Sequence, residues 1–423
     1  MEEWKTIHIS DIGKIVTGKT PRTSIAENYG GRIPFLTPSD DLSGKYAPHS
    51  AKTLTNLGLA EVKNCLLPDH AICVSCIGSD LGKVVMTKQP TVTNQQFNSI
   101  IPNADFDPDF VYYLMTIVGK KLNYLSKTST AVPIVNKSSF SAFEVSVPPL
   151  HEQKRIARIL SSIDDIIALN NRINHNLEEQ AQALYKSWFV DFEPFKDRVF
   201  IDSELGMIPK GWRVGHIEEL ISDTYNGDWG KDEETGAFVK KVFCIRGADI
   251  PSIRVGDSGK MPTRFIQEKH FLSKYLKDND IVVEISGGSP TQSTGRFCRV
   301  TEELVRRYDN SLVCTNFCKA LRPKDGCSIY VSYLWNDLYE RGIMFSYENG
   351  TTGIKNLNLN GLLSGELIVI PDKNTMGAFS DIVRSLNQQA LFNGHESEKL
   401  SCQRDALIPK LMSGELSEFL LTC

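Results

Sequence analysis

A glycine-rich segment near the N-terminus is the first place where residue types and their spacing could do chemistry. Gly13 is followed, after four residues, by Gly18-Lys19-Thr20, which is the spacing of a phosphate-binding P-loop. A nucleotide site would also need a buried strand before Gly13 and a sustained helix after Thr20, but Pro21 follows at once and the next residues are polar. The segment therefore predicts a polar loop that could face phosphate, and an ATP site is not expected.

His70, Cys73 and Cys76 have half the spacing of a zinc site. A structural zinc ion needs four ligands, and the other close cysteine pair, Cys314 and Cys318, is spaced differently. The apolar run at 71–77 is more typical of a buried strand, so no metal site is predicted. Ten cysteines in a chain of 423 residues fit free thiols in a reducing cytoplasm.

The sequence lacks the motifs of a DNA methyltransferase. Such an enzyme would carry an Asn/Asp-Pro-Pro-Tyr/Phe tetrapeptide and a glycine-rich loop for S-adenosylmethionine. The pair Pro148-Pro149 stands between Val147 and Leu150, which is typical of the start of a helix. No catalytic residue is therefore predicted.

Polar loops in both halves of the chain remain as candidates. They combine hydroxyl and amide side chains with cations. Amides can pair with the edge of adenine, and lysine and arginine attract phosphate. A single loop of this kind is more often a solvated turn, but similar loops recur in both halves, which favours DNA binding. The candidate DNA-binding residues are Thr17, Lys19, Thr20, Arg22, Asn94, Gln95, Gln96, Lys127, Ser129 and Thr130 in the first half, and Asn226, Trp229, Lys231, Arg296, Asn316, Thr351, Thr352 and Lys355 in the second.

The chain contains an internal repeat. Residues 4–9 (WKTIHI) recur 208 residues later at 212–217 (WRVGHI), and residues 145–148 (VSVP) recur 223 residues later at 368–371 (IVIP). The larger second distance indicates insertions inside the second copy. Self-similarity on this scale predicts two copies of one domain.

A long helix is predicted after each copy. Its apolar residues alternate at spacings of four and three, which is the seam of a coiled coil. In an antiparallel pair, Asn170 and Asn174 would face Asn393 and Ser397, and such a buried polar layer fixes register at some loss of stability. Two unrelated amphipathic helices are the alternative, which the matched register disfavours. The seam residues are Ile156, Leu160, Ile163, Ile167, Asn170, Asn174, Leu177 and Leu184 in the first helix, and Phe379, Val383, Leu386, Asn393, Leu400 and Leu407 in the second.

Prolines and glycines predict the boundaries of these parts. Pro194 stops the first helix, and Pro409 should kink the second helix or end it early. We expect a first domain at 1–148, a helix at 149–193, a linker at 194–211, a second domain at 212–371, a helix at 372–416 and a tail at 417–423. The predicted fold class is α+β, with two repeated globular α/β domains separated by two long antiparallel coiled-coil helices.

The composition limits the partners of the chain. Its net charge is −4 and no segment is strongly basic, so this chain alone should bind DNA weakly. It contains no run of about 18 apolar residues that would predict a membrane span. Its acidic, amphipathic start differs from a signal peptide, so we expect a cytoplasmic protein without a membrane partner.

The sequence resembles the specificity subunits of type I restriction-modification systems over nearly its whole length. The proline-led helix entry and the ending LIPKLMSGEL are the most specific parts. The segments that carry the resemblance are 4–22 (WKTIHISDIGKIVTGKTPR), 29–42, 66–75 (LLPDHAICVS), 93–98 (TNQQFN), 147–167 (VPPLHEQKRIARILSSIDDII), 206–212 (GMIPKGW), 350–363 (GTTGIKNLNLNGLL) and 407–416 (LIPKLMSGEL).

The resemblance implies a non-catalytic, DNA-binding subunit with two target-recognition domains that read a bipartite double-stranded DNA target. Its implied partners are two modification (methyltransferase) subunits and restriction/translocase subunits. S-adenosylmethionine, ATP and Mg²⁺ would be bound by those partners, and this chain would bind no cofactor.

Two departures stand in the second copy. It has Tyr225-Asn226-Gly227-Asp228-Trp229 where the first has TGKTP, and its Asn-Gln-Gln phrase is reduced to Thr315-Asn316-Phe317. The two domains should therefore read different half-sites. Two other readings stay open: a self-contained restriction or modification enzyme, which the missing motifs disfavour, and a coiled-coil assembly protein that does not bind DNA, which the recurring loops disfavour.

Overall fold

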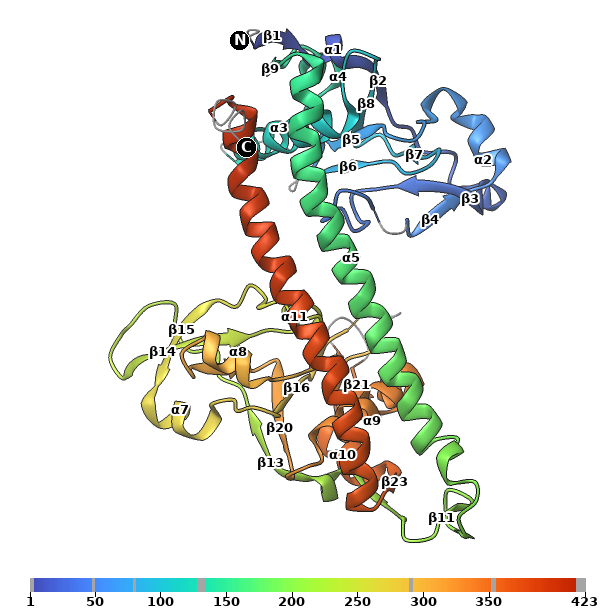
Figure 1. Ribbon diagram of the computed structural model, residues 1–423, viewed down its shortest axis with the longest axis vertical. Coiled ribbons are helices and arrows are strands. Elements are labelled where there is room, and N and C mark those ends of the chain that lie inside the picture. The colour runs from blue at the N-terminus through green and yellow to red at the C-terminus, as the bar shows by residue number, and fades with distance from the viewer. Residues whose placement is uncertain are drawn as a thin grey trace. The chain divides into compact units, whose positions relative to one another are not determined.

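The computed structural model describes residues 4–47, 50–78, 81–127, 134–288, 292–350 and 355–415 (Figure 1). The chain divides into two compact units. Unit 1 contains the described residues up to Ile167 together with those from Leu400, and unit 2 is Ala168–Lys399. We call the globular part of unit 1 that precedes Leu150 the first domain, and residues 212–371 of unit 2 the second domain.

The first domain is built from two small sheets, a strand pair and one long helix. A four-stranded sheet has the order β2-β8-β5-β6, a three-stranded sheet has the order β4-β3-β7, and β1 pairs with β9. Helix α3 buries Phe110, Tyr113 and Met115 against β5 and β6. The elements are β1 (Lys5–His8), α1 (Ile9–Ile12), β2 (Gly13–Thr17), η1 (Ala26–Asn28), β3 (Tyr29–Leu36), β4 (Lys52–Leu54), α2 (Asn56–Glu61), η2 (Lys63–Cys65), β5 (Ile72–Ser75), β6 (Val84–Met86), β7 (Val92–Thr93), β8 (Phe97–Pro102), α3 (Pro108–Lys127), α4 (Lys137–Ser141) and β9 (Glu144–Val147).

The second domain repeats this plan with longer connections. Its sheets have the orders β13-β20-β16-β18 and β15-β14-β19, β12 pairs with β23, and β17-β22-β21 forms an additional sheet. The elements of the linker and of this domain are η3 (Glu193–Phe195), β10 (Phe200–Ile201), β11 (Ile208–Pro209), β12 (Arg213–His216), η4 (Ile217–Leu220), β13 (Ile221–Asn226), β14 (Phe238–Ile245), α6 (Ile250–Arg254), β15 (Thr263–Gln267), α7 (Glu268–Lys274), β16 (Ile281–Glu284), β17 (Ser286–Gly287), β18 (Phe297–Arg299), α8 (Glu302–Arg307), β19 (Leu312–Cys314), β20 (Cys318–Pro323), α9 (Ser328–Glu340), η5 (Ile343–Tyr347), β21 (Glu348–Asn349), β22 (Lys355–Leu357), α10 (Leu359–Gly365) and β23 (Leu367–Ile370).

The strand registers confirm the internal repeat. Lys5 pairs with Val147 in the first domain, and Arg213 pairs with Ile370 in the second. The two repeated sequence segments are thus the two partners of one antiparallel strand pair, formed once in each domain. The α+β fold class is confirmed as well.

Two 40-residue helices follow the domains: α5 (Leu150–Phe189) and α11 (Lys373–Met412). Within unit 2 they run antiparallel, because Asn174 bonds to Ala390 whereas Tyr185, three turns later, packs on Phe379. Helix α11 continues through Pro409 and ends three residues later. No helix of the described residues is long and apolar enough to cross a membrane.

All predicted seam residues of both helices are buried or half-buried. At the polar layer in unit 2, the Nδ2 atom of Asn393 donates to Oδ1 of Asn174 at 2.9 Å, and Asn170 donates to Glu396 at 2.8 Å. The layer is flanked by an aromatic cluster around Phe379 that the seam pattern did not predict. Tyr185 and Phe189 lie off the 4–3 positions and contact Phe379 and Tyr330, so the second domain packs on the helix pair.

Candidate nucleic-acid interface

The first candidate loop, residues 18–22, follows β2 and crosses closely over residues 93–94. The Lys19 N–H donates to the carbonyl of Thr93 at 3.0 Å. A Cβ atom at Gly18 would lie 2.2 Å from the carbonyl oxygen of Asn94, so only glycine fits at this crossing. The close crossing brings the predicted polar segments 17–22 and 94–96 together.

Side chains join these two segments and anchor the loop. Thr20 donates to Oε1 of Gln95 at 2.7 Å, and the Arg22 guanidinium donates to Glu61 on α2 at 2.9 and 2.7 Å. These bonds from Arg22 lower the pKa of Glu61 to about 2. Lys19 is exposed and forms no ion pair within the described residues. It is therefore the cation of this loop most available to a phosphate.

The other first-domain candidates have different environments. Asn94 is buried and its amide donates to Gln96 at 2.8 Å, so it supports the neighbouring side chain instead of facing solvent. Thr17 donates to Asn98 at 2.7 Å. Lys127 is exposed at the end of α3. Ser129 and Thr130 lie outside the described residues, as do Thr351 and Thr352 of the second domain.

The second domain contains a loop with the same backbone contacts. The Asp228 N–H donates to the carbonyl of Cys314 at 2.8 Å, and a Cβ atom at Gly227 would lie 2.0 Å from the carbonyl oxygen of Thr315. Asn226 pairs with Lys319 in the register in which Thr17 pairs with Asn98. Residues 227–231 are thus the structural counterparts of residues 18–22.

The side chains at these equivalent positions differ. Asp228 stands where the first domain has Lys19, and it accepts bonds from His270 at 2.8 Å and Lys274 at 3.4 Å, both on α7. Burial opposes ionisation of Asp228, but these partners outweigh it and lower its pKa. The negative charge at this position is therefore compensated inside the domain.

Trp229 stands where the first domain has Thr20. The guanidinium of the buried Arg264 lies 4.2 Å from the centre of its indole ring, and the Nε atom of Arg264 donates to the Trp229 carbonyl at 2.8 Å. The indole is nevertheless 37% exposed. Arg264 thus holds the ring in place at the surface.

The second loop segment of this domain also has direct counterparts in the first. The Asn94 N–H donates to the carbonyl of Leu36 at the end of β3, and the Thr315 N–H donates to the carbonyl of Ile245 at the end of β14. Gln95 and Gln96 therefore correspond to Asn316 and Phe317, and both second-domain side chains are exposed. Phe317 was not among the sequence candidates. Its position beside Asn316 was the only indication of it.

Three further candidate cations and one polar residue complete the second domain. Arg296 donates to the buried Glu284 at 2.8 and 2.6 Å, and Lys355 donates to Glu348 at 2.8 Å. Their charges are thus compensated within the domain, which suits a structural role. Lys231 and Asn226 are exposed.

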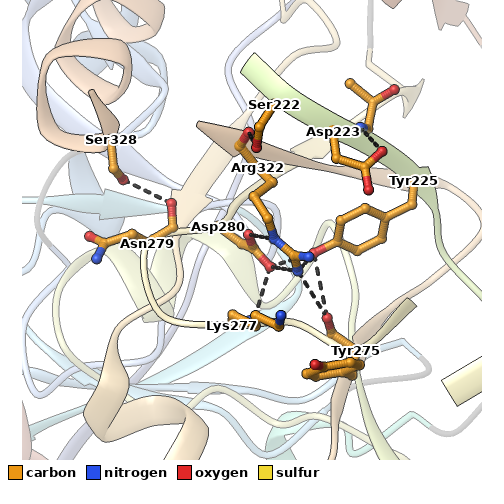
Figure 2. A network of polar contacts seen from close by, with 10 residues as sticks. Ser222, Asp223, Tyr225, Tyr275, Lys277, Asn279, Asp280, Arg322 and Ser328 are labelled. Carbon is orange, nitrogen blue, oxygen red and sulfur yellow. Dashed lines mark hydrogen bonds and ion pairs between the residues drawn. The ribbon is translucent and has the colours of Figure 1, made fainter. Parts of the chain in front are cut away.

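A buried polar network lies at the base of the second loop, on β13 and β20 (Figure 2). Arg322 donates to both carboxylate oxygens of Asp280, at 2.9 and 2.8 Å, and to the Tyr225 hydroxyl at 2.7 Å. Tyr225 in turn bonds to Asp280, which is 1% exposed, and burial raises the pKa of Tyr225. The network fixes the end of β13, from which the loop at 227–231 departs.

Two sequence motifs with possible chemistry have structural explanations. Gly13 to Thr17 form strand β2, and the residues after Thr20 form no sustained helix, so this segment differs from a P-loop. Cys73 lies in β5, and burial raises the pKa of Cys73 to about 12 and that of Cys76 to about 11. Within the described residues, no three His, Cys, Asp or Glu side chains cluster as metal ligands would.

Comparisons with known proteins point to one family. Residues 1–179 match the family model of the type I restriction modification DNA specificity domain. The chain is 30% identical to the specificity subunit of the type I restriction enzyme MjaIX from Methanocaldococcus jannaschii, over 98% of this chain and 94% of that protein. It is 27% identical to the MjaVIII specificity subunit from the same organism, over 67% of this chain and 64% of that protein.

A solved structure shares the fold. The S subunit of a type I restriction-modification system from M. genitalium superposes with a TM-score of 0.52 at 15% identity, covering 97% of this chain and 96% of that one. Full-length similarity at 30% identity carries the assignment, and it confirms the resemblance drawn from the sequence. The chain belongs to the specificity subunits of type I restriction-modification systems, the non-catalytic subunits that determine which DNA target is recognised.

Proposed function

We propose that this chain reads a DNA target of two different short blocks separated by unread base pairs, with one block read by each domain. The observation that carries the proposal is the pair of equivalent loops, 18–22 and 227–231, each crossing a second loop segment at a glycine. Their backbones correspond while their exposed side chains differ. One scaffold with two sets of side chains is what a split, asymmetric target requires.

The chain is proposed to act in a complex with two modification subunits, to which restriction/translocase subunits are added. A net charge of −4 leaves this chain with little attraction for phosphate, so the partners would supply most phosphate contacts. S-adenosylmethionine, ATP and Mg²⁺ would be bound by those partners.

A gel-shift experiment tests whether the modification subunits are needed for tight DNA binding. We expect the purified chain to bind its target duplex poorly alone and tightly together with the modification subunits. Tight, specific binding by the chain alone would contradict it. Failure of the assembled complex to bind any target, with methylation absent, would contradict the DNA-reading proposal itself.

Helices α5 and α11 are proposed to set the number of unread base pairs. Each has 40 residues, or about 60 Å at a rise of 1.5 Å per residue, which exceeds one DNA turn of about 34 Å. The seam and its polar layer fix the register of the pair. Inserting one heptad into both helices should therefore lengthen the spacer and leave both blocks unchanged.

Genome-wide mapping of methylated adenines in a strain that carries the double insertion measures the spacer. A heptad inserted into α5 alone is the matched control, because it misaligns Asn174 with Asn393 and should abolish methylation. A spacer of the original length in the double variant, with methylation retained, would show that another feature sets the distance.

A further inference from the structure

We infer that the second domain selects its DNA block through apolar contact with thymine C5-methyl groups, made by Phe317 together with Trp229 on the loop that crosses it. The inference rests on the proposed function and names the chemistry by which this domain reads DNA. It begins from two large aromatic side chains at the surface: Phe317 is 55% exposed and Trp229 is 37% exposed.

Both aromatic residues occupy positions where the first domain carries polar side chains. Trp229 corresponds to Thr20, and Phe317 corresponds to Gln96, by the backbone hydrogen bonds that the two domains share. Thr20 and the neighbouring Gln95 bond to one another and present hydroxyl and amide groups. At the positions of Thr20 and Gln96 the second domain therefore presents aromatic rings, while Asn316 keeps an amide at the position of Gln95.

The two aromatic positions belong to one site because their loops cross. The Gly227 N–H donates to the carbonyl of Cys318 at 3.4 Å, and the Asp228 N–H donates to that of Cys314 at 2.8 Å. Asp228, which lies between Gly227 and Trp229, is thus bonded to the end of β19, and the chain continues from β19 to Phe317. The close approach of Gly227 to Thr315 leaves no room for a side chain between the loops.

The backbone of Phe317 and the indole ring of Trp229 are held by the protein before any ligand arrives. The Phe317 carbonyl accepts hydrogen bonds from the N–H groups of Ile285 and Ser286, at 2.9 and 3.2 Å. Arg264 lies over the indole of Trp229 and bonds to its carbonyl. An indole fixed in this way loses little conformational freedom on binding, and the bonded backbone of Phe317 fixes the position from which its side chain projects.

Thymine is the base that matches this surface. In the major groove it alone presents a methyl group, whereas guanine, cytosine and adenine present hydrogen-bonding groups to the same approach. Asp228, which precedes Trp229 in the chain, pairs with Lys274 and bonds to His270, so it does not repel DNA as a free charge would. An aromatic ring without a hydrogen-bonding atom, as in Phe317, can distinguish thymine only through its methyl group.

The experiment replaces each thymine of the mapped target by deoxyuridine, which removes only the methyl group. Binding of the duplex is measured with the full chain in complex with its modification subunits. At one or two thymines of the second block, deoxyuridine should weaken binding by about four-fold, the value of one buried methyl group. In Phe317→Ala the same replacements should have no further effect, whereas Phe317→Leu should retain part of the sensitivity.

Leu272→Ala is the matched control, because Leu272 is a 66% exposed apolar residue of α7 in the same domain. It should leave both binding and deoxyuridine sensitivity unchanged. Sensitivity that persists in Phe317→Ala, or no sensitive thymine in the second block, would overturn the inference while leaving the proposed function intact. Failure of the Phe317→Ala chain to assemble with its modification subunits would overturn it in favour of a protein contact.

Discussion

The two domains position their candidate DNA-binding loops with the same backbone bonds but anchor them with loop side chains of opposite charge. In the first domain the loop cation Arg22 bonds to the carboxylate of Glu61 on α2, the helix that follows β4. In the second domain the loop carboxylate Asp228 bonds to the cation Lys274 and to the imidazole of His270, both on α7, which follows β15. The loop position is therefore preserved by backbone bonds, and the charges can change sign without moving it.

The side chains buried beneath the loops also differ between the two domains. Val16, Ala71 and Ile101 of the first domain belong to an apolar cluster. By strand register, their counterparts in the second domain are Tyr225, Asp280 and Arg322, the buried network of Figure 2. The same sheet topology is thus compatible with either apolar or ionic side chains beneath the loop.

The largest expected effect comes from breaking that network. Arg322→Ala leaves the buried carboxylate of Asp280 without its partner, which should lower the free energy of unfolding by about 3–5 kcal/mol. The triple variant Tyr225→Val, Asp280→Ala, Arg322→Ile copies the first domain and should recover most of that loss, because no buried charge remains. Urea unfolding of the three proteins measures both.

The triple variant also tests whether the ionic network has a role in DNA binding. If the ionic network only supports the loop, this variant should bind the complete target with wild-type preference for both blocks. A triple variant as unstable as Arg322→Ala would contradict the equivalence of the two interiors.

The next effect concerns the residue that holds Trp229. Arg264→Ala removes the contact with the indole ring and the bond to the Trp229 carbonyl, so the complex should bind its target more weakly by about 1–3 kcal/mol. Arg306→Ala, on the surface of the same domain, is the control and should have no effect. Equal losses in both variants, or a loss of recognition of the first block in Arg264→Ala, would argue against a local role.

The exposed cation of the first loop should change the salt dependence of binding. Lys19→Ala removes one potential phosphate contact, so the slope of log affinity against log salt should become shallower by about 1. If Lys19 or Arg22 reaches a base edge, its replacement by alanine should weaken binding by roughly 1–3 kcal/mol. Asp228→Asn, at the position equivalent to Lys19, should leave the slope unchanged. Equal slopes for Lys19→Ala and the wild type would remove Lys19 from the phosphate contacts.

The smallest expected effect is on acid titration. Arg22 lowers the pKa of Glu61 to about 2, so its stabilising contribution is complete above the usual pKa of a glutamate and is lost as the pH falls through about 2. The pKa of Asp228 is also lowered, with the same sign. Carboxyl chemical shifts followed by NMR should place the pKa of Glu61 below that of an ordinary surface glutamate, and in Arg22→Ala closer to the ordinary value, because the backbone N–H of residue 22 still bonds to Glu61. An ordinary value in the wild type would show that the ion pair does not persist in solution.

The sequence predicted the elements whose information is local. The 4–3 seam indicated both long helices, and the repeated segments 4–9 and 212–217 indicated a second copy of the first domain. The sequence placed residues 225–229 opposite 17–21, but the exact register, with Asn226 equivalent to Thr17, rests on backbone bonds between segments far apart in the chain. The pairing of Arg22 with Glu61, 39 residues away, was hidden for the same reason.

The exposure of Phe317 could not be predicted from the sequence. A comparison by residue type would align it with Phe97, which is buried in the core of the first domain. The strand registers instead align Phe97 with Cys318 and leave Phe317 at the surface. A shift of one residue along a strand exchanges buried and exposed faces, and only the paired strands reveal it.

Each domain is proposed to read its own block of the target through these equivalent loops. Genome-wide methylation maps of two strains test this proposal, one strain carrying Lys19→Ala with Thr20→Ala and the other carrying Trp229→Ala with Phe317→Ala. We predict that the first pair relaxes or abolishes recognition of one block only, that the second pair does so for the other block only, and that the spacer is unchanged in both. Relaxation of the same block by both pairs, or an unchanged target in both strains with methylation retained, would contradict the claim.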